Sequence, residues 1–122
     1  MQTNPITVVY KWTAKPGQFE TLKQIYRGVT DAMKANEPGA LDVQVFASEE
    51  DQSLHVRDEF ADADALGFHL GETAAPHFPK LLDIATPGTF YFFGNVPDAM
   101  QNAARAMGLN AEFSTHMDGF HR

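Results

Sequence analysis

Two histidines, His69 and His77, are the side chains of this sequence best suited to proton transfer. An imidazole gains and loses a proton near neutral pH, so either residue could serve as a general base. Glu72 follows three residues after His69 and could share its face of a helix. The set His69, Glu72 and His77 does not have the spacing of a zinc site, so we expect no metal here. The alternative is that both histidines are half-buried structural residues at a helix bend.

A second group of polar side chains alternates along two segments with strand-like periodicity. Its members are Asp42, Gln44, His55, Arg57 and Glu59. Alternate residues of a strand lie on the same face of a sheet, so we expect this group on the face opposite the helices. There Arg57 would neutralise an acid on the neighbouring strand. Alternatively, the group would line the interior of a dimer or its rim.

Aromatic residues are unusually frequent, with ten Phe, three Tyr and one Trp among 122 residues. Most of them must pack in a core. Because strand positions alternate, others are candidates for the wall of an apolar pocket that holds a flat ligand. The sequence has no glycine-rich phosphate loop, serine-nucleophile motif or dinucleotide fingerprint.

The length of 122 residues predicts one domain. The formal net charge of −7 argues against nucleic acid and anionic membranes as partners. The absence of cysteine excludes disulfides and thiol catalysis. With no signal-peptide pattern and no apolar stretch long enough to span a bilayer, we expect a cytoplasmic protein. The acidic run 49–64, which includes Asp58, is expected to be a solvated turn and helix start.

The periodicity of apolar residues predicts strands and helices in alternation. The expected order is strand 7–14, helix 18–35, strand 40–48, strand 53–60, a helical segment 62–84 broken or bent at Gly71 and Pro76, strand 89–96, and helix 97–107. The first helix has one apolar stripe, made of Phe19, Leu22, Tyr26, Val29 and Met33. Strand 89–96 is apolar throughout and is expected to be buried on both faces.

The order β-α-β-β-α-β is the ferredoxin-like pattern of an α+β protein. We expect residues 1–96 to form this domain and residues 97–122 to add a helix and a tail to it. Helices on a single face of a four-stranded sheet leave its other face uncovered. A symmetric partner would cover that face, so we expect a homodimer. The C-terminal extension could reach across the partner or cap an edge strand of its own sheet.

The stretch from Asp58 to His69, DEFADADALGFH, resembles the third-strand and second-helix signature of antibiotic biosynthesis monooxygenase domains. These domains often have an acid, an aromatic residue, a short polar capping turn and then a helix that ends in histidine. Pro76, His77 and Phe78 are similar to the second His-Phe element of the family. The order of elements also matches, so the resemblance spans residues 5–96.

The resemblance implies a ferredoxin-like subunit that dimerises into an α/β barrel and holds a small pocket. Some members of the family oxidise polycyclic phenols or quinols to quinones with O2, without metal, flavin or haem. We therefore expect a cofactor-independent monooxygenase that acts on a small phenolic or quinol-type aromatic. The alternative is a non-catalytic binding protein for an aromatic metabolite or haem.

Within that expectation, His69 is the first candidate for the base or for orienting the substrate hydroxyl, and His77 is the second. Glu59 is expected to orient a neighbouring group. The residues expected to bind the substrate as the pocket wall are Trp12, Phe60, Phe68, Phe78 and Phe92.

Overall fold

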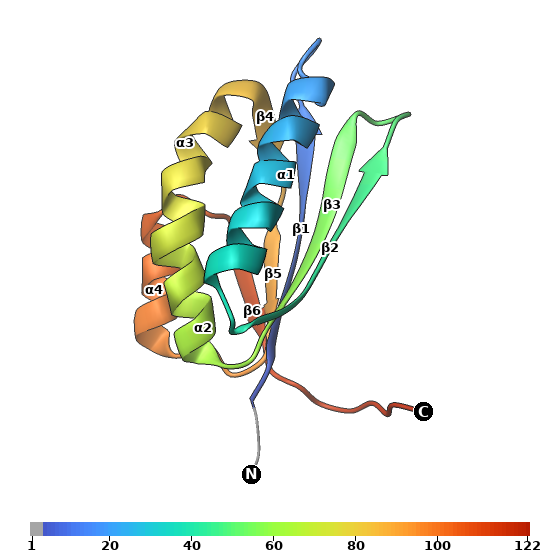
Figure 1. Cartoon of the computed structure of the whole chain (residues 1–122). Coiled ribbons are helices and arrows are strands. Elements are labelled where there is room, and N and C mark those ends of the chain that lie inside the picture. Colours follow the sequence, from blue (N-terminus) through green and yellow to red (C-terminus); the bar gives the residue numbers. More distant parts are fainter. Residues whose placement is uncertain (1–3) are drawn as a thin grey trace.

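A single mixed β-sheet with helices on one of its faces makes up the computed structural model, which describes residues 4–122 (Figure 1). The elements in chain order are β1 (Ile6–Ala14), α1 (Phe19–Asn36), β2 (Ala40–Ser48), β3 (Ser53–Phe60), α2 (Ala63–Phe68), the π-helix η1 (His69–Ala74), α3 (Ala75–Ile84), β4 (Ala85–Pro87), β5 (Phe90–Phe93), α4 (Asp98–Ala106) and β6 (Ala111–Ser114). The expected ferredoxin-like order is therefore present, with a further helix and strand after it.

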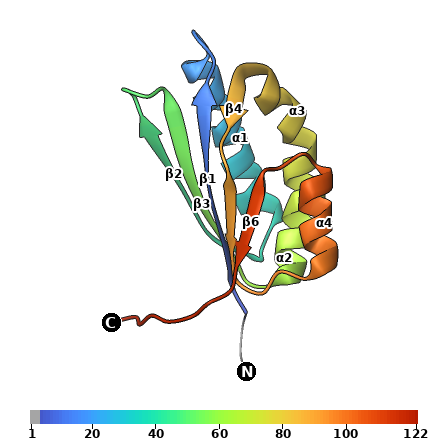
Figure 2. The same ribbon diagram turned by 180° about the vertical axis from the view of Figure 1, so that it is seen from behind.

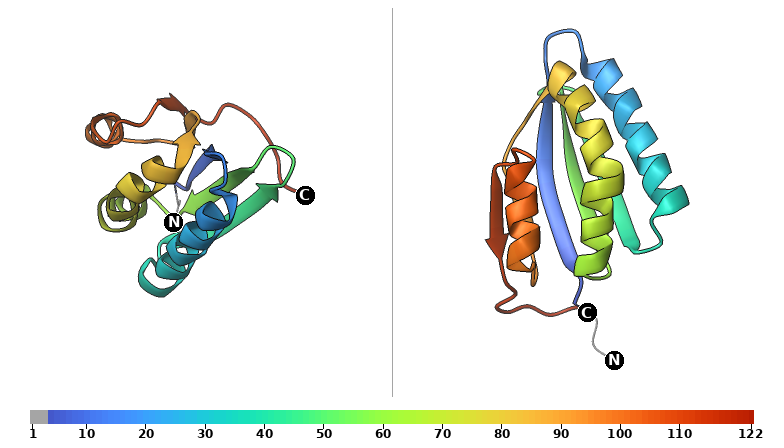
Figure 3. Two further views of the ribbon diagram at one scale, coloured as in Figure 1. Left: turned by 90° about the horizontal axis from the view of Figure 1, so that it is seen from above. Right: turned by 90° about the vertical axis from the view of Figure 1, so that its left-hand side faces the viewer.

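The sheet has the strand order β2-β3-β1-β5-β6, and the short strand β4 pairs with β1 beside β5. All pairs are antiparallel except β5 with β6, which run parallel. Figure 2 shows the sheet without a covering layer on the side opposite the helices. Seen from above and from the side in Figure 3, α1, α2, α3 and α4 lie on one side of the sheet. This arrangement confirms the predicted α+β class.

Alternation along β1 and β3 decides which side chains meet the helices. Val8, Tyr10 and Trp12 of β1 are buried, and Trp12 lies opposite Leu54 of β3 in the sheet register. The inward positions of β3 are 54, 56, 58 and 60, so Asp58 lies in the core with the apolar residues. On α1, all five residues of the predicted apolar stripe are buried against this side of the sheet.

The sequence predicted that Gly71 and Pro76 break or bend the second helical segment, and the structure shows no break there. Asp62 begins it by accepting a hydrogen bond from the Ala65 amide at 2.9 Å. The chain then passes through η1 without leaving the helix. Pro76 and Pro79 both lie inside this continuous segment, where neither can donate a backbone N–H to an earlier carbonyl. The change in sequence pattern around Gly71 therefore marks a wider turn and not an end.

Strand β5 is shorter than predicted and is buried on one face only. Phe90 and Phe92 lie in the core, whereas Tyr91 and Phe93 are 42% and 43% exposed. No helix lies over their side of the sheet within residues 4–122, which is why the expectation of two buried faces is wrong for the single chain. The four aromatic residues of β5 therefore alternate between the core and the uncovered face of the sheet.

The C-terminal extension contains the predicted helix, α4, but it ends in a strand that the sequence pattern did not predict. β6 pairs Phe113 with Phe92 of β5 and so becomes the edge of the sheet. The two rings stack with centroids 4.8 Å apart. The extension thus caps an edge strand of its own sheet, one of the two options that the sequence left open. No helix of the described chain is long and apolar enough to cross a membrane.

Candidate active site

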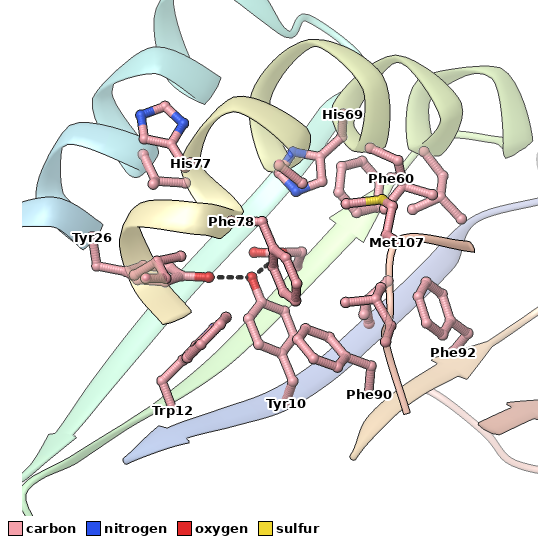
Figure 4. Close-up of a pocket in the computed structure, with 18 residues that line it drawn as sticks. Tyr10, Trp12, Tyr26, Phe60, His69, His77, Phe78, Phe90, Phe92 and Met107 are labelled. Atoms are coloured by element: carbon pink, nitrogen blue, oxygen red, sulfur yellow. Dashed lines mark hydrogen bonds between the residues drawn. The ribbon is translucent and has the colours of Figure 1, made fainter. Parts of the chain in front are cut away.

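A small cavity of about 50 Å³ lies between the covered face of the sheet and the helices α1, α2, η1 and α3 (Figure 4). Met107 and Leu109, from the segment between α4 and β6, close one side of it. Its wall is mostly aromatic and aliphatic, and four kinds of polar side chain reach it: Tyr10 and Tyr26, Asp58, His69 and His77, and the indole of Trp12. The cavity therefore combines an apolar wall with few, defined polar groups, as ligand sites do.

His69 is held by a buried carboxylate from the end of α1. Its Nδ1 lies 3.1 Å from Oε2 of Glu37, and both side chains are almost fully buried. Burial opposes ionisation of Glu37, but the hydrogen bonds from His69 and Thr73 outweigh it and hold the pKa of Glu37 below its ordinary value. An ionised carboxylate only accepts hydrogen bonds, so Nδ1 of His69 carries the proton. In the neutral ring, Nε2 then carries the lone pair that a general base uses to accept a proton.

His69 and Thr73 reach one carboxylate because they lie four residues apart, on the same face of the helical segment. Both residues lie in η1, both are buried, and both contact Oε2 of Glu37. Glu37 itself ends α1 and donates its backbone N–H to the Met33 carbonyl. Isolated π-helical turns inside α-helices occur often at functional sites, because the wider turn re-aims side chains. Here η1 carries both residues that contact the buried Glu37 carboxylate.

His77 lines the same cavity from α3. Its Nδ1 lies 2.8 Å from the carbonyl oxygen of Thr73, and a carbonyl can only accept, so Nδ1 donates. The Nε2 atom of the neutral ring is again free. Unlike His69, His77 has a backbone partner and no carboxylate, so no negative charge stabilises its protonated form directly.

A second buried acid, Asp58, lies at the sheet side of the cavity. The Tyr10 hydroxyl donates to its Oδ2 at 2.9 Å, and the Tyr26 hydroxyl lies 2.6 Å from that of Tyr10 (Figure 4). Burial raises the pKa of Asp58 to about 6, with nearby Glu37 adding to the rise and His69 and Tyr10 opposing it. Burial and the charge of Asp58 also raise the pKa of both tyrosines, which therefore remain hydrogen-bond donors at physiological pH.

Of the residues predicted from sequence, most are brought together and two are not. His69, His77, Trp12, Phe60, Phe78 and Phe92 all line the cavity. Phe60 packs on His69 with ring centroids 5.1 Å apart, and Trp12 meets Phe78 edge-on at 5.7 Å. Phe68 is instead 48% exposed on α2 and lies outside the cavity.

Glu59 is the other residue that the structure does not bring to the cavity. It projects from the opposite face of β3, where its carboxylate is 4.0 Å from Arg57. Arg57 also pairs with Asp42 on β2 at 3.0 Å, so this polar row forms the cross-strand ion pairs that were one of its two expected roles. Side chains alternate along a strand, which is why Glu59 and its cavity-facing neighbour Asp58 diverge.

Glu37, Asp58, Tyr10 and Tyr26 are the site residues that the sequence analysis missed. For Asp58 a signal existed, because it occupies an inward position of the strand pattern, where an ionisable side chain is unusual. Glu37 gave no such signal, since it looked like part of the Glu37-Pro38-Gly39 helix stop. Within residues 4–122 no three His, Asp or Glu side chains are grouped in a way that could hold a metal ion. Glu72, weighed with the histidines as a ligand, is exposed.

Comparison with protein families decides which family the chain belongs to. The family model described as antibiotic biosynthesis monooxygenase matches residues 5–80, which is more than half of the chain. The chain is a member of the antibiotic biosynthesis monooxygenase family. The match ends within α3, so it contains β1 to β3, η1 and both histidines of the cavity. Comparison with curated proteins gave no significant match.

Solved structures show the same family fold. MupZ from Pseudomonas fluorescens superposes with a TM-score of 0.81 at 18% identity, covering 97% of this chain and 94% of MupZ. A putative antibiotic biosynthesis monooxygenase from Caulobacter crescentus CB15 superposes with a TM-score of 0.68 at 23% identity. The match covers 78% of this chain and 92% of the Caulobacter protein. A mutant of SnoaB, a cofactor-independent oxygenase from Streptomyces nogalater, superposes with a TM-score of 0.62 at 20% identity. The match covers 73% of this chain and 90% of SnoaB. The MupZ match, at 97% of this chain, is long enough to include α4 and β6.

Proposed function

We propose that this family member is a cofactor-independent oxygenase that oxidises a small phenolic or quinol-type aromatic in the cavity beside His69. The observation that carries the proposal is that His69 lines an aromatic cavity while its Nδ1 lies 3.1 Å from the buried carboxylate of Glu37. Membership of a family that includes a cofactor-independent oxygenase supports it. The aromatic wall supplies a dry surface for a flat ring.

In this mechanism, the neutral Nε2 of His69 takes the phenolic proton and Glu37 stabilises the imidazolium that results. Glu37 also keeps the proton on Nδ1 and so fixes the orientation of the ring. The electron-rich phenolate then gives its electrons to O2. A phenol and O2 yield a quinone and one water, whereas a quinol and O2 yield a quinone and hydrogen peroxide. The substrate supplies all the electrons in both cases.

The size of the cavity requires a local opening for binding. Cavities of about 150 Å³ accommodate a benzene ring, and the volume here is about 50 Å³. We propose that Met107 and Leu109 move aside when a ring enters, because they lie in the short segment between α4 and β6. Methionine is unbranched and repacks easily, which suits it to that position.

Oxygen consumption tests the proposed activity. Purified protein mixed with 1,4-naphthalenediol is expected to consume O2 faster than the diol does alone, with quinone formed in proportion. In a parallel sample, haem is added and the visible spectrum is followed. A haem absorption band without any O2 consumption above the spontaneous rate would contradict the oxygenase and favour the binding protein.

We also propose that a second copy covers the uncovered face of the sheet. Phe46, Tyr91 and Phe93 are each exposed by 42–60% on that face, and the last two stack on each other. Exposed aromatics grouped on a sheet face favour burial against another surface. In a symmetric homodimer, these three residues would be buried on both copies.

Gel filtration with light scattering is expected to give twice the chain mass of 13.5 kDa. Phe46→Glu puts a charge on the uncovered face and is expected to shift the protein to the monomer mass. Phe68→Glu is the matched control, since Phe68 is 48% exposed on the helical side. A monomeric wild type, or equal shifts for both variants, would rule out this interface.

A further inference from the structure

The hydroxyl of Thr73 donates to the same oxygen of Glu37 that His69 contacts. Thr73 lies in η1 and is buried, so water does not compete for this hydrogen bond. A threonine inside a helix commonly donates to a backbone carbonyl of its own preceding turn. Here the acceptor is a carboxylate 36 residues earlier in the chain, at the end of α1. The hydroxyl therefore serves that carboxylate, while the Thr73 carbonyl accepts from His77.

Two donors contact the Glu37 carboxylate within residues 4–122, and both of them act on one oxygen. Oε2 accepts from His69 and Thr73, whereas Oε1 is buried and has no partner in this part of the chain. In a buried site, hydrogen bonds to a carboxylate offset its loss of hydration and favour the charged form. Thr73 thus supplies one of the two hydrogen bonds on which the ionisation of Glu37 depends.

The charged side chains around Glu37 do not replace the Thr73 hydroxyl. His69 is the basic side chain that pairs with Glu37 among the described residues. Asp58 on β3 interacts with Glu37 through its charge, and Asp64 on α2 lines the same surface hollow as Glu37. Both are acids, so each of them disfavours a negative charge on Glu37. Without the Thr73 hydroxyl, His69 alone would oppose the effect of burial.

We propose that Thr73 is a positioning residue, whose hydroxyl keeps Glu37 ionised and its Oε2 turned toward Nδ1 of His69. An ionised Glu37 holds the proton on Nδ1 and stabilises the imidazolium that forms when His69 accepts a proton, whereas a neutral carboxyl stabilises it far less. Thr73 does not line the cavity, so it acts through Glu37 and not on a ligand. This inference rests on the proposed function for the role of His69 as a base. The ionisation of Glu37 is measurable whether or not the protein is an oxygenase.

Carbon-13 NMR of the Glu37 side-chain carboxyl tests the proposal without any substrate. In the wild type, the hydrogen bonds from His69 and Thr73 hold the pKa of Glu37 below its ordinary value of 4.5. Thr73→Val removes the hydroxyl but keeps the shape of the side chain, and is expected to raise the titration midpoint of Glu37 by about one pH unit. Thr73→Ser restores a hydroxyl and is expected to recover most of the difference. Thr86→Val, at an exposed position of β4, is the matched control and keeps the wild-type midpoint.

Two results of this titration would overturn the proposal. One is the same midpoint in wild type and Thr73→Val. The other is an equal rise in Thr73→Val and Thr73→Ser, which would assign the effect to packing and not to the hydroxyl. If Thr73→Val does not fold, Thr73→Ala serves instead, because it also lacks the hydroxyl and has a smaller side chain. The same rise is expected there.

Oxygen consumption with 1,4-naphthalenediol tests the consequence for the base. The kcat of Thr73→Val is expected to fall about tenfold while KM changes by about twofold or less, because the aromatic wall is intact and only the base is weakened. Thr73→Ser is expected to recover most of this loss. A raised Glu37 midpoint with an unchanged kcat would overturn the positioning role. A wild type that consumes no O2 would contradict the proposed function, and the NMR titration alone would then decide whether Thr73 keeps Glu37 ionised.

Discussion

Replacing His69 with alanine is expected to lower the turnover of a working phenol or quinol substrate by about 10²–10⁴-fold. The reason is that His69 has the one imidazole of the cavity whose Nδ1–H is held by a buried carboxylate, which leaves Nε2 as the proton acceptor. Steady-state O2 consumption measures the effect. Binding of hydroquinone without O2 is expected to change much less, because the alanine variant keeps the aromatic wall.

Three further variants identify the base. His116→Ala replaces an exposed histidine of the C-terminal tail and is expected to leave turnover unchanged. Glu37→Gln keeps a polar partner for His69 but removes the charge that stabilises the imidazolium, so a loss of turnover is expected. His77→Ala is expected to have a smaller effect than His69→Ala. Full activity of His69→Ala, with loss in His77→Ala, would transfer the role of base to His77.

The second large effect concerns stability and pH. Asp58→Asn is expected to raise the free energy of unfolding at neutral pH by up to about 3 kcal/mol, less the cost of a weaker bond to Tyr10. Burial raises the pKa of Asp58 from 3.8 to about 6. Between these two pH values, the folded state keeps a proton on Asp58 that the unfolded chain releases. Wild-type stability contributed by this group is therefore greatest below pH 3.8 and falls as the pH rises to about 6.

Urea unfolding at a series of pH values measures this effect, with the fluorescence of Trp12, the one tryptophan of the chain, as the signal. The advantage of Asp58→Asn over wild type is expected to be small at pH 3.8 and largest above pH 6. Asp83→Asn, at an exposed position of α3, is expected to show no such gain between these pH values. A difference between Asp58→Asn and wild type that does not change with pH would show that burial does not raise this pKa.

The pH dependence expected for Asp58 follows from the cost of burying its carboxylate. A buried carboxylate with one unpaired oxygen makes the chain less stable at neutral pH than a neutral side chain would. Residues that lower stability are retained in proteins where they serve a function.

The sequence by itself determined the order of elements of the ferredoxin-like core and the inward faces of β1 and β3. The period of the apolar residues predicted α1 with its complete buried stripe and the inward positions of β1 and β3. Histidine chemistry and the family resemblance proposed His69, His77 and five aromatic residues for the site, and all of these but Phe68 line the cavity. A period of apolar residues along one strand or helix shows which face of that element is buried.

Only the tertiary structure decided which charged group meets His69. Glu37 and His69 are 32 residues apart, and their contact depends on how the end of α1 packs against η1. The pairing of β6 with β5 likewise joins two segments that have no shared sequence pattern. Such contacts are set by how packed elements are placed in space, and a one-dimensional period carries no information about that placement.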